Sequence, residues 1–76
     1  MTPSRFKEEV IAAVYRNLRG YDGMVASFES RPNLDSLIAA AYEAGQKEFE
    51  SLPYKMSANT FWWNKSNQVA DDLAWS

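Results

Sequence analysis

The sequence contains neither cysteine nor histidine. These two absences exclude disulfides, zinc sites with sulfur or imidazole ligands, thiol nucleophiles and Ser–His catalysis. An enzyme made from this chain would have to use carboxylates, lysine, tyrosine or a magnesium-type ion. No arrangement of such groups stands out, and we therefore expect a protein that is not an enzyme and needs no cofactor or metal.

Two pairs of adjacent carboxylates, Glu8-Glu9 and Asp71-Asp72, are the closest approach to catalytic chemistry. General acid–base catalysis needs two carboxylates that face each other across a cleft. Neighbouring residues on a helix instead point about 100° apart. We interpret both pairs as solvated helix surface, and no phosphate-binding, dinucleotide-binding or EF-hand motif is present elsewhere.

Long apolar runs and an excess of basic residues are also absent. No segment reaches the length of about 18 apolar residues that a membrane span needs, and Met1 to Glu9 has no apolar stretch typical of a signal peptide. We expect a cytoplasmic protein with no membrane partner. The net charge is −2, from 8 basic and 10 acidic residues. DNA-binding domains usually have a basic excess, so nucleic acid is the less favoured partner.

The apolar residues repeat with helical spacing over most of the chain. Its 76 residues allow a single domain spanning 1–76, with about 60% of the surface buried on folding. The pattern predicts an all-α fold, a compact bundle of three main helices. We expect them over Pro3–Arg19, from Asn33 or Leu34 to Ser51, and from Ser57 or Asn59 to near the C-terminus. Asn33 is the expected N-cap of the second.

The segment between the first two predicted helices has two interpretations. Gly20 to Gly23 has the composition of a turn. The residues from Met24 to Glu29 fit either one helical turn or an alternating strand. Because a lone strand would have nothing to pair with, we favour a fourth short helix near 24–29 or an ordered loop.

The predicted core is taken from the apolar stripes of the three main helices. Gly45 and the alanines before it narrow the second helix, so that a neighbouring helix could approach closely there. Trp75, near the end of the chain, is expected to cover the core and anchor the C-terminus. The predicted core residues are Phe6, Val10, Val14, Leu18, Phe28, Leu37, Ile38, Ala41, Phe49, Trp62, Val69 and Leu73.

Three consecutive aromatic residues, Phe61, Trp62 and Trp63, are the most informative feature. Because successive helical residues point about 100° apart, the three rings cannot all face one thin core. At least one is expected near the surface, where exposed aromatic side chains often mark a contact site. The alternative is that Trp62 fills the core and Trp63 lies flat across a helix seam. Tyr54 and Lys65 are close in sequence and complete the predicted partner-binding set.

The order Tyr42-Glu43-Ala44-Gly45, Pro53-Tyr54 and Trp62-Trp63 resembles that of signature residues in ribosome modulation factor and similar short bacterial and phage proteins. Those proteins are markedly basic, as binding to ribosomal RNA requires. Residues 33–76 here have six acidic against three basic side chains, a net charge of −3. The spacer between the glycine and the proline is also short. The resemblance therefore transfers no function to this chain.

The surplus of aromatic surface and the lack of catalytic groups together predict a small non-enzymatic protein-binding module. Inhibitors, adaptors and accessory factors of phages and plasmids are proteins of this kind. The expected partner is a larger protein, or a second copy of the chain in a homodimer. The alternative is a nucleic-acid- or ribosome-associated regulatory factor that binds phosphates through N-terminal cations such as Arg5 and Arg16, and bases through its aromatic rings.

Overall fold

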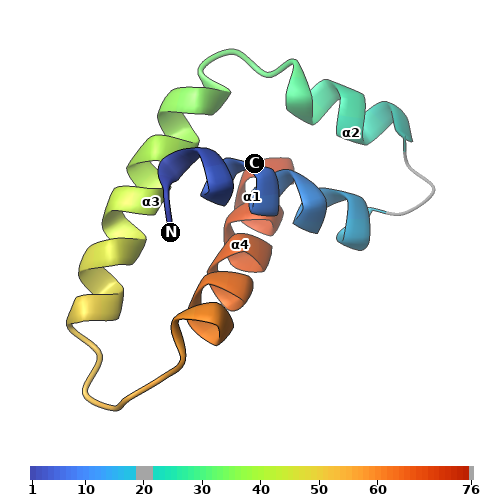
Figure 1. Ribbon diagram of the computed structural model, residues 1–76. Coiled ribbons are helices and arrows are strands. Elements are labelled where there is room, and N and C mark those ends of the chain that lie inside the picture. The colour runs from blue at the N-terminus through green and yellow to red at the C-terminus, as the bar shows by residue number, and fades with distance from the viewer. Residues whose placement is uncertain (19–21, 76) are drawn as a thin grey trace.

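The computed structural model describes residues 1–18 and 22–75, which form four α-helices and no strands (Figure 1). The helices are α1 (Pro3–Asn17), α2 (Asp22–Glu29), α3 (Leu34–Glu50) and α4 (Ala58–Ala74). The predicted all-α fold with three main helices and a short fourth is confirmed. The strand interpretation of residues 24–29 is wrong, and Gly23, predicted as part of a turn, lies inside α2.

α3 and α4 form a helical hairpin, and α1 crosses it. α3 and α4 run in opposite directions and are joined by the loop 51–57, while α1 lies across both of them (Figure 1). The most extensive contact between two helices is that of α1 with α4. α2 packs against α1 and α4. The core therefore lies where α1 crosses the hairpin.

Both ends of α1 follow from local sequence. The Thr2 side chain accepts a hydrogen bond from the backbone N–H of Arg5, at 3.2 Å, and Pro3 occupies the first helical turn. This is the N-cap arrangement that the order Thr-Pro predicts. The helix ends at Asn17, with Leu18 as its C-cap. The predicted end near Arg19 and the predicted cap at Gly20 lie outside the described residues.

α3 begins at Leu34 with Asn33 as its N-cap, as predicted, but the cap has an unusual conformation. Asn33 is the residue before the helix, but its φ of 66° places it in the left-handed region and its side chain makes no capping hydrogen bond. Asparagine tolerates this conformation better than most residues do. Asn33 still begins the helix through its backbone, because its carbonyl accepts from the N–H of Leu37 at 3.0 Å.

Eight of the predicted core residues are buried, three are partly buried and one is exposed. Ala41, Phe49 and Leu73 are the partly buried ones. Leu37 is 41% exposed, so its prediction is wrong: it is one position, or about 100°, away from Ile38, on which the buried line of α3 is centred. The buried predicted residues are Phe6, Val10, Val14, Leu18, Phe28, Ile38, Trp62 and Val69. Buried residues outside the prediction are Ala13, Val25, Leu34, Gly45, Phe61, Ser66 and Ala70.

Trp75 does not cover the core. Its side chain is 64% exposed, which contradicts the expectation of a buried anchor. α4 ends at Ala74, and Trp75 is its C-cap, with the backbone N–H bonded to the carbonyl of Asp71. Val69 and Ala70 dock this end of the helix instead. None of the described helices is long and apolar enough to span a bilayer.

Candidate protein-binding surface

Trp62 is at the centre of an aromatic cluster in the core. Its ring centroid is 5.1 Å from each of three others: the stacked ring of Tyr42 and the edge-on rings of Phe6 and Phe61. Phe61 in turn packs against Phe49 at 5.0 Å. Both Phe61 and Trp62 are thus core residues, each 6% exposed. The structure answers which of the two tryptophans is buried: it is Trp62.

Gly45 explains how α3 accommodates this indole. A Cβ at this position would lie 3.1 Å from Cζ3 of Trp62 and 3.2 Å from Cε of Lys65. Contacts this short are tighter than ordinary packing, so a side chain at this position would displace its neighbours by a few tenths of an ångström. Of the narrow part of α3 predicted from sequence, Gly45 is thus packed against α4 through these two side chains, whereas Ala39 and Ala40 are exposed.

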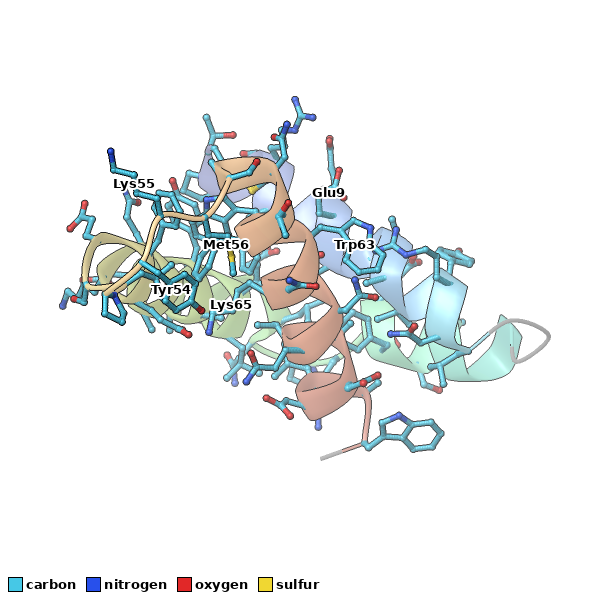
Figure 2. All side chains as sticks on the ribbon, turned by 90° about the horizontal axis from the view of Figure 1, so that it is seen from below. Glu9, Tyr54, Lys55, Met56, Trp63 and Lys65 are labelled. Atoms are coloured by element: carbon cyan, nitrogen blue, oxygen red, sulfur yellow. The ribbon has the colours of Figure 1, made fainter. Side chains whose placement is uncertain are left out.

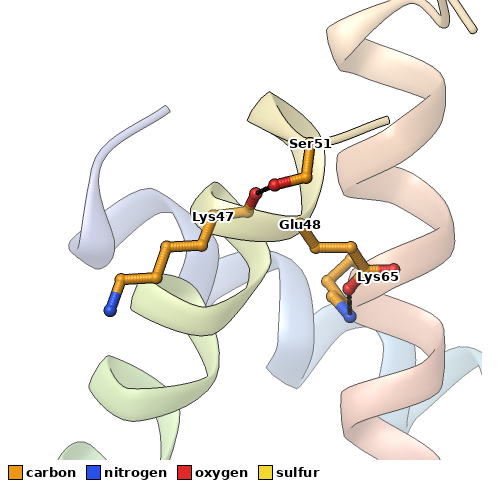
Figure 3. A network of polar contacts seen from close by, with 4 residues as sticks. All are labelled: Lys47, Glu48, Ser51 and Lys65. Carbon is orange, nitrogen blue, oxygen red and sulfur yellow. Dashed lines mark hydrogen bonds and ion pairs between the residues drawn. The ribbon is translucent and has the colours of Figure 1, made fainter. Parts of the chain in front are cut away.

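Lys65 is tied to α3 and is not a freely available cation. Its ammonium forms an ion pair with the Glu48 carboxylate, and its stem lies against Gly45 (Figure 3). The neighbouring contact in Figure 3 is local to α3: the Ser51 hydroxyl donates to the carbonyl of Lys47 at 2.8 Å. The charge of Lys65 is thus already paired in the free protein.

Trp63 has the opposite environment to Trp62. Its side chain is 55% exposed, and the guanidinium carbon of Arg16 lies over its ring, 5.6 Å from the centroid. Beside it, α1 and α4 border a shallow hollow of about 160 Å³. We call the residues that line this hollow, apart from the buried Trp62, together with Arg16, the Trp63 surface. They are Met1, Arg5, Glu9, Arg16, Asn59 and Trp63.

The five predicted partner-binding residues do not form one patch. Tyr54 and Lys65 lie on one side of α4 and Trp63 on the other, next to Glu9 (Figure 2). The physical reason is helical geometry, because two residues apart means about 200° around the axis. Tyr54 is exposed and borders a separate hollow of about 160 Å³, whose lining includes Lys65 and the buried ring of Phe61.

From the sequence, Arg5 and Arg16 are contact residues only in the alternative function, as cations that bind phosphate, and neither they nor Glu9 are connected with Trp63. Arg5, Glu9 and Arg16 are four and seven residues apart, which places them on one face of a helix. The sequence shows this spacing. It does not show that this face of α1 lies beside Trp63, because α1 and α4 meet through contacts between residues more than forty positions apart, such as Asn17 with Asp71.

No family model, curated protein or solved structure matches this chain. The likeness to ribosome modulation factor is thus not accompanied by a family match. In the parts of the chain that the structure describes, no three carboxylates gather in a group that could bind a metal ion. The function has to be argued from the surface itself.

Proposed function

We propose that this protein is a small non-enzymatic protein-binding module, an inhibitor, adaptor or accessory factor, whose contact surface is the Trp63 surface. The observation that supports this most is the exposure of one indole beside a hollow while both of its aromatic neighbours are enclosed. Tryptophan and arginine are the residues most enriched among those that dominate binding energy in protein interfaces. Here both occur together, in contact with each other.

Other exposed aromatic side chains make weaker candidates. Tyr54 lies in the loop 51–57, and Trp75 follows the end of α4. Trp63 instead lies in the interior of α4, directly after the buried Trp62, so the helix fixes the position of its backbone. An anchor fixed by its own backbone loses little conformational freedom on binding, and that favours affinity.

The test is affinity capture from the lysate of the native host, with quantitative mass spectrometry, for the wild type and two variants. Trp63→Ala removes the proposed anchor, and Trp75→Ala removes an equally large exposed indole from outside the surface. Circular dichroism first verifies that both variants fold. We expect Trp63→Ala to lose a protein that the wild type and Trp75→Ala retain. Equal retention by all three would contradict the assignment of the surface.

A homodimer that covers the same surface is the close variant of this proposal. Sedimentation equilibrium of the purified chain distinguishes it from binding to another protein. If the wild type dimerises and Trp63→Ala is a monomer, the partner is a second copy. If both are monomers at micromolar concentration, the partner is another chain.

Nucleic acid is the second candidate, supported by the position of the Arg16 guanidinium over Trp63 and by Arg5 at the adjoining hollow. Cations that meet phosphates and an exposed ring that meets bases are the elements of single-strand binding. Retardation of a labelled oligonucleotide at low salt, lost steeply as salt rises, would favour this function. The absence of retardation would dispose of it.

A further inference from the structure

The basic side chains of the described helices differ in whether a carboxylate is paired with them. Lys7, Lys47 and Lys65 each form an ion pair with a carboxylate of this chain. Arg5 and Arg16, the two cations of the Trp63 surface, form no ion pair with any carboxylate of residues 1–18 and 23–75. Among these residues, two guanidinium groups without an ion pair therefore lie on the surface that also presents the exposed indole of Trp63.

The spacing of these groups defines what could bind between them. Arg5 and Arg16 are eleven residues apart on α1, which is close to three helical turns and about 16 Å along one face. Between them lie Glu9 and the hollow beside Trp63. A partner that matches this pattern has negative charge at two ends and an uncharged, apolar centre, because a central carboxylate would face Glu9.

Arg16 is suited to receive a carboxylate. The carbon of its guanidinium lies 5.6 Å from the centroid of the Trp63 ring, and a guanidinium presents its N–H donors in a planar fork. Two parallel N–H donors match the two oxygens of a carboxylate. Arg16 and Trp63 together thus offer a carboxylate receptor beside an apolar ring.

We propose that the partner contacts the Trp63 surface with a short acidic segment, an apolar side chain in the hollow and carboxylates toward Arg5 and Arg16. This inference rests on the proposed protein-binding function and specifies the chemistry of the partner. An extended chain advances about 3.3 Å per residue, so the two acidic residues would be about five positions apart.

The acidic segment belongs to another protein. α3 is the acidic helix of this chain, but three of its four carboxylates, those of Asp35, Glu43 and Glu48, are already paired with Lys7, Lys47 and Lys65, which leaves only Glu50. Docking α3 of a second copy on the Trp63 surface would require breaking those pairs. It would also join unlike surfaces, a head-to-tail contact that closes only into a ring or continues as a filament.

The experiment is selection of binders from a display library of random twelve-residue peptides on the immobilised wild-type chain. The enriched peptides are then synthesised, and their dissociation constants are measured for the wild type, Arg16→Glu, Arg16→Lys and Lys55→Glu. Lys55 is an exposed loop cation outside the surface, so Lys55→Glu changes the net charge as Arg16→Glu does. Circular dichroism verifies the fold of each variant.

We expect the enriched peptides to have acidic residues on both sides of an apolar one. Arg16→Glu should weaken their binding at least tenfold, Lys55→Glu less than twofold, and Arg16→Lys by an intermediate factor because it keeps the charge and loses the planar donors. Enrichment of neutral or basic peptides would overturn this inference and leave the proposed function standing. So would equal loss in Arg16→Glu and Lys55→Glu.

Two further outcomes also decide the matter. If no peptide is enriched over a Trp63→Ala surface, the inference is overturned, and the lysate comparison alone decides the proposed function. If a labelled oligothymidylate binds and displaces the enriched peptides, the surface is a nucleic-acid site, and both proposals fail together.

Discussion

Trp62 and Trp63 are adjacent in sequence and chemically identical, yet the first is 6% exposed and the second 55%. Rotation by about 100° per residue separates their directions. The first indole meets the rings of Phe6, Tyr42 and Phe61, while the second meets the guanidinium of Arg16 and solvent. The comparison shows that residue type alone does not separate a core residue from an exposed residue in this helix. Position on the helix does.

The largest expected effect is the loss of the buried indole. Trp62→Ala should reduce the free energy of unfolding by about 3–5 kcal/mol, because it removes a large ring and leaves a cavity among three others. A chain of this size has little stability beyond that amount. Urea unfolding followed by circular dichroism measures the loss. A reduction below about 1 kcal/mol would contradict the central position of Trp62.

Trp62→Phe provides a milder variant in case the alanine variant does not fold. It keeps one ring in the cluster and should reduce the free energy of unfolding by less than Trp62→Ala does. The order of the three proteins, wild type, phenylalanine variant, alanine variant, is then itself the prediction.

The second effect tests the space that the buried indole occupies. Gly45→Ala places a methyl group 3.1 Å from the Trp62 ring, and such overpacking costs about 1–3 kcal/mol. The higher helix propensity of alanine returns about 1 kcal/mol of this. Gly23 is the matched control, because a Cβ there would meet no atom within 4 Å. We expect Gly45→Ala to lower the urea midpoint and Gly23→Ala to raise it; a rise for both would contradict close packing at Gly45.

The helices could be predicted from sequence because their signals are local. The apolar repeat of Phe6, Val10 and Val14 and the Thr-Pro start indicated α1. Pro53 indicated the break between α3 and α4. The argument that three consecutive rings cannot all be enclosed was also local, and Trp63 bears it out. These features depend on neighbours within a few residues.

The composition of the Trp63 surface could not be predicted, because it depends on how helices meet. Tyr54 and Lys65 are close to Trp63 in sequence but lie on the other side of α4 (Figure 2). Arg16 is far from Trp63 in sequence but lies over its ring. Leu37 fails for the same reason: the helical repeat shows which residues share a face, and only packing shows which face is buried.

A smaller effect compares ion pairs in two environments. The Lys65 side chain is 13% exposed and that of Glu48 52%, whereas Lys47 and Glu43 are both more than 70% exposed. Double-mutant cycles with alanine should give coupling of about 1 kcal/mol for the first pair and about 0.3 kcal/mol for the second, since solvent screens exposed charges. Both should weaken in 0.5 M salt. Equal coupling would contradict the difference in burial.

The smallest expected effect on stability is that of the exposed indole. Trp63→Ala should change the free energy of unfolding by less than about 0.5 kcal/mol, because exposed substitutions rarely do more and alanine is the better helix former. The same urea titration as for Trp62→Ala measures it. A loss of 3 kcal/mol would make Trp63 a second core residue and remove the basis for a binding surface. If stability is unchanged, a loss of partner binding by this variant cannot come from unfolding. It then has to come from the missing side chain at the surface, so that Trp62 is needed for folding and Trp63 for binding.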